Sequence, residues 1–188
     1  MRYFKTGYWH YTSADVRGRV RAVTNDLNGL AALARDCGIE MGVHNHTAYV
    51  GAALWDIAPA IDALDARWAG YYFDPRHAVA EGGGGAWKAA AHLAMSRLKM
   101  VALKDFFWAK TEKGWRIRDC PLGEGAVDWE WMGGALRDAR FTGPISLHLE
   151  YEIAGATAKQ RTDRTIEAAV RDLEFARRTL YARSSVRV

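Results

Sequence analysis

Short apolar segments alternate with longer amphipathic segments along the whole chain. The short segments, rich in β-branched and aromatic residues, predict strands, whereas a period of three to four apolar positions in the longer ones predicts helices. This alternation favours βαβ units and a parallel sheet, either doubly wound or closed as a barrel. The predicted strands are Arg2–Trp9, Ile39–His46, Trp68–Asp74, Leu98–Asp105 and Pro144–Glu150; the predicted helices are 16–37, Ala52–Leu64, Trp87–Arg97, Val127–Ala139 and Thr157–Ala182.

Several residues mark the ends of these elements. Gly38 follows the first helical pattern, where a helix C-terminal glycine belongs. Pro59 predicts a kink or a late start in the second helix. The run Glu81–Gly85 predicts a flexible loop before the next helix. The candidate N-caps of the first helix are Thr12, Ser13 and Asp15.

Two further segments lie outside the regular pattern. The long connection 106–126 is expected to contain a small hairpin around Lys113–Gly114, and long ordered connections are usually functional. The tail Ser184–Val188 is expected to fray.

Composition limits the class of protein. A chain of 188 residues, 49% hydrophobic and 12% aromatic, predicts one globular domain, 1–188, and not a disordered tail. Its apolar stretches fall short of the roughly 18–20 residues of a membrane span, and the N-terminus lacks a signal-peptide pattern, so we expect a cytoplasmic protein without a membrane partner. The 26 basic residues are interspersed with 22 acidic ones, which predicts no nucleic-acid partner despite the net charge of +4.

Polar side chains collect at the C-terminal ends of four predicted strands. Enzymes with parallel sheets build their sites at this edge, in barrels and in open sheets alike. No GxGxxG or GxxxxGK[ST] motif follows any predicted strand, which disfavours a nucleotide-binding fold. The polar groups are His44, Asn45 and His46; Asp74 and His77; Lys104 and Asp105; and His148, Glu150 and Glu152.

Five stretches near these strand ends carry a recognisable pattern: VHNH at 43–46, FDPRH at 73–77, ALKD at 102–105, PLGEGAVDW at 121–129 and GPISLHLEYE at 143–152. In this order and spacing they resemble motifs of the sugar phosphate isomerase/epimerase family, the xylose isomerase-like TIM barrels. The resemblance covers about residues 40–152, and it combines five separate matches.

The resemblance implies that the strand at 2–9 is the fourth strand of a barrel, so the first three βα units are missing. A complete eight-unit barrel takes about 250 residues. We therefore expect a partial (β/α) TIM barrel with about five parallel strands, either a fragment of a longer protein or a reduced barrel that closes by pairing with another copy. Exposed strand edges favour homo-oligomerisation or modest stability.

The resemblance also implies a divalent metal, Mn, Zn, Mg or Fe, held at the positions of His44, Asp74, Ala102 and Glu150. The imidazole of His44 replaces a carboxylate and can still bind metal, whereas Ala102 offers no ligand. The expected metal ligands are therefore His44, Asp74 and Glu150. One of His46, His77 and His148 is expected to complete this mixed nitrogen and oxygen site.

The activity implied by the resemblance is isomerisation or epimerisation of a sugar or polyol, in which a proton moves at the carbon next to a carbonyl. Such a reaction needs a base near that C–H bond and a cation near the enediolate oxygens. Glu150 is the expected base, His44 a second acid or base, and Lys104 the cation. The expected substrate contacts are His46, His77, His148, Asp105 and Trp108. The tryptophans that are candidates for a pocket wall, with core positions as the alternative, are Trp9, Trp55, Trp108 and Trp115.

Other interpretations stay open at this point. A metal-dependent dehydratase or hydrolase of the same superfamily would use a similar site. A catalytically inactive truncated barrel, or a sugar-binding module, is the non-enzymatic alternative. A surface lysine is the alternative interpretation of Lys104. His10 and His92 are expected to be core residues, and Cys37 and Cys120 are expected to have no role in the chemistry.

Overall fold

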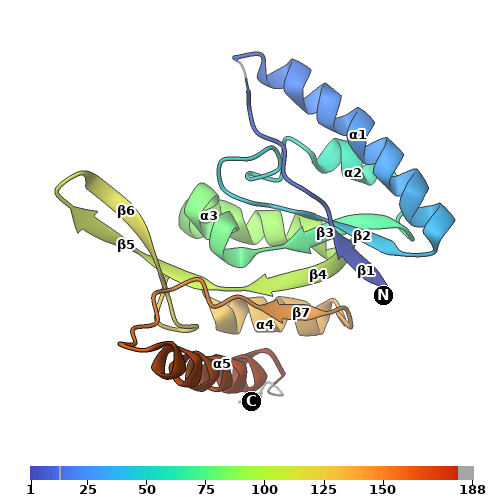
Figure 1. The fold of residues 1–188 in the computed structure, drawn as a ribbon. Helices are drawn as coiled ribbons and strands as arrows, with labels where there is room; N and C mark the ends of the chain where they lie inside the picture. The colour runs from blue at the N-terminus through green and yellow to red at the C-terminus, as the bar shows by residue number, and fades with distance from the viewer. Residues whose placement is uncertain (13, 182–188) are drawn as a thin grey trace, which may run out of the picture. The chain divides into compact units, whose positions relative to one another are not determined.

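The computed structural model describes residues 1–12 and 14–181 (Figure 1). The chain forms two compact units. Unit 1 comprises Met1–Ala102 and Thr142–Ile145, and unit 2 comprises Leu103–Phe141 together with the described part of Ser146–Val188. The candidate cap Ser13 and the tail 184–188 lie outside the described residues.

A five-stranded sheet has the strand order β1-β2-β3-β4-β7. β1 pairs with β2, β2 with β3, and β3 with β4, and all three pairs are parallel. In the β2–β3 pair, His44 lies opposite Tyr72. This arrangement confirms the predicted α/β fold with parallel strands joined through helices, and it places β1 and β7 at the ends of the sheet. The strands are β1 (Tyr3–Lys5), β2 (Glu40–His44), β3 (Ala69–Phe73), β4 (Leu98–Leu103) and β7 (Ile145–Leu147).

The middle of the sheet is buried on both faces. All five residues of β3 are buried, as expected for a parallel strand covered on its two sides. Gly42 in β2 has no room for a side chain, because a Cβ there would lie 2.6 Å from Met100 Cε and 2.9 Å from Tyr72 Cβ. Tyr72 and Met100 form a core cluster with Ala102, so the strand ends that carry polar residues rest on a packed layer.

The helices follow the predicted capping signals. Asp15 caps α1 (Val16–Cys37) by accepting a hydrogen bond from the Gly18 amide at 2.8 Å, and Gly38 ends that helix with φ of 64°. The helix α2 (Ala58–Asp62) has Pro59 in its first turn, which confirms the late start.

The interruption expected at 81–85 is a kink in the structure and not a loop. Helix α3 spans Pro75–Met95 as two helical stretches that meet at Gly83, where φ is 58° and ψ is −164°. The helix begins early because Asp74 accepts a hydrogen bond from the His77 amide at 3.1 Å and Pro75 occupies the first helical position. The consequence is that His77 lies in the first turn of a helix.

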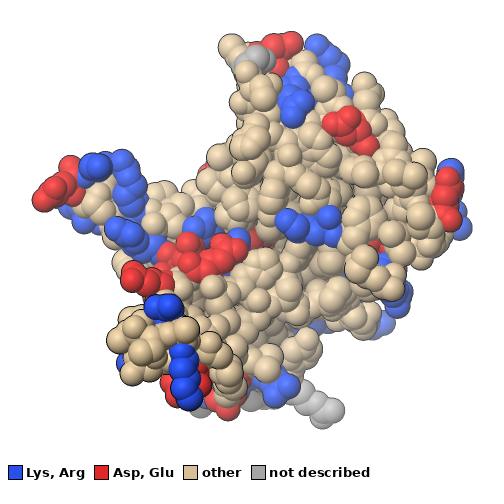
Figure 2. Space-filling model, in the orientation of Figure 1, with Lys and Arg blue, Asp and Glu red and all other residues tan. Residues whose placement is uncertain are grey.

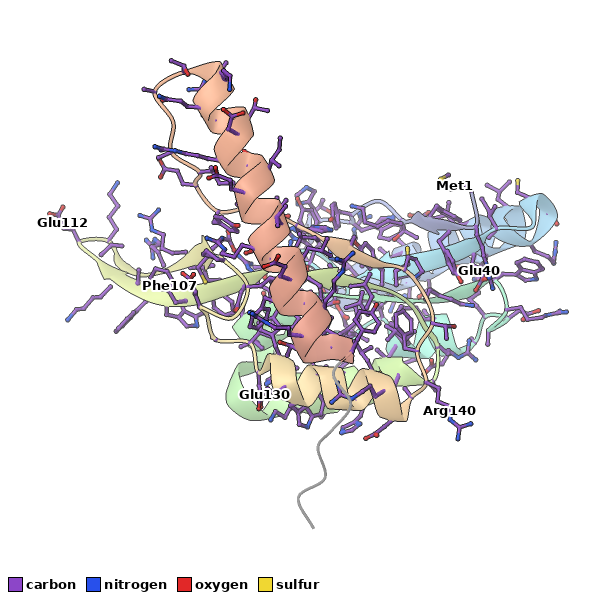
Figure 3. All side chains as sticks on the ribbon, turned by 90° about the horizontal axis from the view of Figure 1, so that it is seen from below. Met1, Glu40, Phe107, Glu112, Glu130 and Arg140 are labelled. Atoms are coloured by element: carbon purple, nitrogen blue, oxygen red, sulfur yellow. The ribbon has the colours of Figure 1, made fainter. Side chains whose placement is uncertain are left out.

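Unit 2 contains the predicted hairpin, formed by β5 (Asp105–Thr111) and β6 (Gly114–Cys120), in which Trp108 pairs with Ile117. Figure 3 shows Glu112 at the tip of this hairpin. The helices of unit 2 are α4 (Trp129–Asp138) and α5 (Ala158–Tyr181). Gly133 lets the two helices approach, since a Cβ there would lie 2.6 Å from the Thr179 carbonyl oxygen.

Several strands and apolar positions differ from the sequence-based expectation. The predicted strand Arg2–Trp9 is ordered as a strand only over Tyr3–Lys5, and Pro144–Glu150 only over Ile145–Leu147. Some apolar residues of the predicted helix faces are exposed, because periodicity identifies a face of a helix but not the element that covers it. These are Val16, Leu33, Ile166, Val170 and Leu173.

The visible surface has mixed charge. Figure 2 shows Lys and Arg side chains interspersed with Asp and Glu, without a continuous basic stripe on the face drawn. Within residues 1–12 and 14–181, no helix combines the length and the apolar composition that a bilayer crossing requires.

Candidate metal and proton-transfer site

Asp74 is the centre of a buried polar cluster in unit 1. It follows β3 directly, caps α3, and is 0% exposed. The side chain of Asn45, at the end of β2, holds the backbone of Asp74 through two hydrogen bonds. Asn45 Nδ2 donates to the Asp74 carbonyl at 3.0 Å, and the Asp74 amide donates to Asn45 Oδ1 at 2.7 Å. The carboxylate is therefore fixed by a strand, a helix and a neighbouring strand end.

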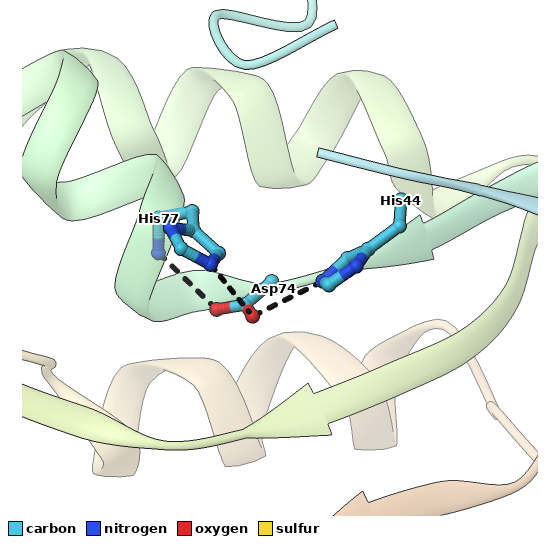
Figure 4. A group of neighbouring side chains, drawn as sticks. All are labelled: His44, Asp74 and His77. Carbon is cyan, nitrogen blue, oxygen red and sulfur yellow. Dashed lines mark hydrogen bonds and ion pairs between the residues drawn. The ribbon is translucent and has the colours of Figure 1, made fainter. Parts of the chain in front are cut away.

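Two imidazoles face this carboxylate (Figure 4). Asp74 Oδ2 lies 3.1 Å from His44 Nε2 and 3.7 Å from His77 Nε2. His44 comes from the end of β2 and is 3% exposed, and His77 comes from the first turn of α3 and is 2% exposed. Three of the polar side chains that follow predicted strands therefore lie together.

The ring of His44 is held on two sides. It stacks on Tyr72, with ring centroids 4.6 Å apart and an interplanar angle of 25°. Its Nδ1 lies 2.9 Å from the Tyr8 hydroxyl, which accepts a hydrogen bond from Lys5 Nζ at 2.9 Å. Packing and hydrogen bonding therefore leave His44 little rotational freedom.

The position of the proton on neutral His77 follows from the groups that donate hydrogen bonds to its ring. Its Nδ1 lies 3.0 Å from Arg76 Nη1 and 3.3 Å from the Thr47 amide nitrogen. A guanidinium and an amide N–H only donate hydrogen bonds, so Nδ1 is an acceptor here and neutral His77 carries its proton on Nε2. That N–H faces Asp74. The His46 ring lies beside His77, with centroids 4.0 Å apart.

His44, Asp74 and His77 fit a divalent metal in donor type and spacing. One ligand atom from each lies within 4.8 Å of the others, and all three residues are buried. Two imidazole nitrogens and one carboxylate oxygen are a donor set suited to zinc and related ions. Binding through both Nε2 atoms requires each to give up its proton. The three residues could hold such an ion.

Comparison with known families identifies the chain. A family model described as xylose isomerase-like TIM barrel matches residues 4–178. The chain belongs to the xylose isomerase-like TIM barrel family. None of the curated proteins compared with the chain matches it.

Solved structures of this fold are similar at low identity. D-psicose 3-epimerase from Clostridium cellulolyticum H10, solved with D-tagatose, has a TM-score of 0.70 at 16% identity, covering 95% of this chain and 64% of its own. The IOLI protein, solved with a binding zinc atom, has a TM-score of 0.70 at 14% identity, covering 95% and 64%. D-allulose 3-epimerase from Methylomonas sp., in complex with D-allulose, has a TM-score of 0.65 at 19% identity, and the match covers 95% of this chain and 62% of the epimerase. The chain therefore spans less than two thirds of these xylose isomerase-like barrels.

A second group of sequence-predicted residues of this xylose isomerase-like chain lies in unit 2. Lys104 Nζ, on a residue that is 2% exposed, contacts both oxygens of Glu150 at 3.1 Å, and His148 Nδ1 lies 3.3 Å from Glu150 Oε1. The hydrogen bond to His148, reinforced by the charge and hydrogen bonds of Lys104, outweighs burial and lowers the pKa of Glu150 to about 2. Glu150 is thus ionised, and in this state it is a weak base.

Asp105 is 0% exposed, and its carboxylate accepts five hydrogen bonds. Four donors are backbone amides and one is the indole N–H of Trp129, at 2.8 Å. These contacts assign Asp105 to anchoring the loop before α4, and its substrate contact stays a prediction. The four amides belong to Phe106, Gly123, Gly125 and Val127.

The remaining sequence-predicted residues are scattered. Trp108 and Trp115 are exposed on the hairpin, and Trp55 lines a cavity of about 320 Å³ together with Ala78 and Trp87. Trp9 donates to Asp26 at 2.8 Å. The expectation of buried histidines at 10 and 92 is wrong, because both are exposed where their segments face solvent. Among the cysteines, Cys37 is exposed, and burial raises the pKa of Cys120 to about 12, which fits an unreactive thiol.

Several site residues were missed or left without a role by sequence reasoning. Asn45 and Arg76 lie inside the quoted motifs at 43–46 and 73–77, so the motifs themselves carried the signal. Tyr8 lies in a segment predicted as strand, and its place beside His44 depends on how the chain leaves β1.

Proposed function

We propose that this chain belongs to an enzyme that isomerises or epimerises a sugar or polyol by moving a proton at the carbon next to a carbonyl. The observation that carries the proposal is the buried Asp74 carboxylate between His44 and His77, at the C-terminal ends of parallel strands. Structures similar to it include epimerases solved with D-tagatose and with D-allulose, which supports a ketose-like substrate.

We propose that His44, Asp74 and His77 hold a divalent metal. Such an ion, when bound, polarises substrate oxygens and stabilises the negative charge of an enediolate. Asp74 supplies the anionic ligand, and it is oriented by Asn45 and by the start of α3. His44 is oriented by the hydrogen bond at its Nδ1. At His77, the Arg76 guanidinium donates to Nδ1 and so favours a proton on the Nε2 that would face the ion, a contact that metal binding would have to change. Burial of all three excludes bulk water from the ligand atoms.

The roles of the unit 2 residues are part of the proposal. Glu150 is the proposed base and Lys104 the proposed partner of negative charge on the substrate. Since the contacts of His148 and Lys104 hold the pKa of Glu150 at about 2, Glu150 becomes an effective base only when substrate groups take over these donors.

Deuterium exchange tests the proposal. The chain, loaded with Mn²⁺ or Zn²⁺, is incubated in D₂O with D-tagatose, D-allulose or D-fructose, and proton NMR follows the C–H signal next to the carbonyl. We expect exchange together with a new epimer or aldose. The substitution Asp74→Asn should reduce the exchange rate at least about a hundredfold, as expected for loss of a metal ligand.

The matched control is Asp65→Asn, because Asp65 is a surface carboxylate paired with Arg67. It should leave the rate unchanged. Absence of exchange with all three sugars, or equal rates for the wild-type chain and the Asp74→Asn variant, would overturn the proposed activity.

A second candidate is sugar binding without turnover. Its support is Ala102, which is 0% exposed in the apolar cluster with Tyr72 and Met100 and which occupies the strand position where the family resemblance implies a metal ligand. Saturation by sugar in calorimetry, with no C–H exchange at any metal concentration, would favour this candidate over the enzyme.

A further inference from the structure

We propose that Tyr8 is a positioning residue for a metal at His44, and that its hydroxyl serves as the hydrogen-bond partner of His44 both with and without the ion. The inference rests on the proposed metal site. It concerns the nitrogen of His44 that faces away from Asp74, at which Tyr8 Oη lies 2.9 Å from Nδ1.

The phenol of Tyr8 is held firmly beside His44. Its ring stacks on Tyr49 at a centroid distance of 4.8 Å and an angle of 28°. Lys5 Nζ donates to the Tyr8 oxygen at 2.9 Å and lies 4.1 Å from the ring centroid. Since Tyr8 lies after the end of β1 and His44 at the end of β2, the phenol links two neighbouring strand ends.

Proton positions in the metal-free state follow from these contacts. An ammonium group only donates, so the Tyr8 oxygen accepts from Lys5. An ionised Asp74 carboxylate only accepts, so neutral His44 carries its proton on Nε2 and donates it to Asp74 Oδ2 across 3.1 Å. His44 Nδ1 is then an acceptor, and the Tyr8 O–H donates to it. The three contacts Lys5–Tyr8, Tyr8–His44 and His44–Asp74 thus each have one donor and one acceptor.

A metal on His44 reverses the direction of the hydrogen bond between Tyr8 and His44, so that His44 becomes the donor. The ion needs the lone pair of Nε2, so neutral His44 must carry its proton on Nδ1. The proton lost from Nε2 is matched by one gained at Nδ1 through exchange with solvent. Nδ1–H then donates to the Tyr8 oxygen, which accepts from Lys5 and His44 together. The Tyr8 O–H then turns away from His44, which the 38% exposure of the Tyr8 residue permits.

This reversal explains why a hydroxyl suits the position. A carboxylate or a carbonyl oxygen only accepts, so it would favour the Nδ1–H form alone. A phenol both donates and accepts, and it stays bonded to His44 in either form. Tyr8 therefore supports a ligand that can bind and release its ion without losing a buried hydrogen bond.

The test is metal affinity, measured on the full chain. Metal-free wild-type, Tyr8→Phe and Tyr11→Phe proteins are titrated with Zn²⁺ against a competing chelator, and Co²⁺ absorption spectra report the ligand geometry. Tyr11 is the matched control, because it is also 38% exposed and its hydroxyl donates to Asp56. We expect Tyr8→Phe to weaken Zn²⁺ binding about 10–100-fold and Tyr11→Phe to leave it unchanged.

Nitrogen NMR of the His44 ring provides a second readout. The proton is expected on Nε2 in the metal-free protein and on Nδ1 in the zinc form. Circular dichroism and thermal melting of the metal-free variants show whether they fold. Equal Zn²⁺ affinity of the wild-type and Tyr8→Phe chains, or a proton that stays on Nε2 in the zinc form, would overturn the role of Tyr8 alone. Failure of the wild-type chain to bind either ion would overturn the metal site as well.

Discussion

Asn45 holds the peptide backbone of Asp74 with both ends of its side-chain amide, at 3.0 and 2.7 Å. Asn45 itself is 2% exposed, so neither hydrogen bond competes freely with water. The two contacts fix the end of β3 against the end of β2. The position of the Asp74 carboxylate between two imidazoles therefore depends on a residue that does not contact the proposed ligand atoms.

The first prediction concerns this contact. Asn45→Ala removes both hydrogen bonds and leaves buried backbone groups of Asp74 without them, so we expect a loss of about 2–4 kcal/mol in unfolding free energy. Urea denaturation measures it. Asn28→Ala, on the exposed surface of α1, is the control and should change stability by less than about 0.5 kcal/mol. Similar losses in the two variants would contradict the role of Asn45.

The second prediction concerns the loop anchored by Asp105. Asp105→Asn replaces one oxygen with an NH₂ group that opposes N–H donors, so we expect destabilisation of more than about 2 kcal/mol. Hydrogen exchange should accelerate at the amides of Gly123, Gly125 and Val127. The exposed Asp138→Asn variant should behave like the wild type. Unchanged exchange at these amides would show that the five contacts do not hold the loop.

The third prediction tests whether His77 binds the metal or only lies beside it. Zinc on Nε2 would place a proton on Nδ1, opposite the guanidinium of Arg76 at 3.0 Å. Arg76→Met removes that opposing donor and one positive charge, so Zn²⁺ should bind about tenfold more tightly, equivalent to about 1.4 kcal/mol. Chelator competition measures the affinity, with exposed Arg140→Met as the control. Unchanged or weaker binding in Arg76→Met would count against His77 as a ligand.

The fourth prediction concerns pH. The contacts of His148 and Lys104 lower the pKa of Glu150 in the folded chain from its usual 4.5 to about 2. Ionised Glu150 therefore stabilises the fold above about pH 4.5, and this contribution declines as the pH falls toward 2. The stability difference between the wild type and Glu150→Gln should be largest at pH 5–7 and should shrink at pH 3. Urea unfolding at each pH measures it, and a difference that grows on acidification would contradict the account.

Much of the fold follows from local sequence signals. The alternation of strands and helices, the Asp15 cap, Gly38 and the hairpin around Gly114 are each determined by a few neighbouring residues. The first half of α3 was missed because its start depends on the Asp74 cap and Pro75, which follow a strand directly. The glycine run was correctly identified as a break in the helix, but the break is a kink at Gly83 and not a loop.

The candidate site was partly predictable for a similar reason. Parallel strands bring their C-terminal ends together, so His44 and Asp74 were grouped from their positions after predicted strands. The third expected ligand was Glu150, which lies in unit 2 beside Lys104, and His77 was one of three residues expected to complete the set. The tautomers of the two histidines could not be predicted from the sequence, because they depend on hydrogen bonds with Tyr8 and Arg76. A strand pattern does not show where those two side chains point. Asp105 also lies at a strand end, yet its oxygens face backbone amides, a distinction that only the loop conformation makes.

X-ray absorption at the zinc edge tests the central claim most directly. The zinc-loaded chain should show one ion bound by two imidazole nitrogens and a carboxylate oxygen at about 2.0–2.2 Å, and the signal should be lost in Asp74→Asn. A sulfur ligand at about 2.3 Å, or an ion that stays bound when Asp74 is replaced, would contradict a metal site built from His44, Asp74 and His77.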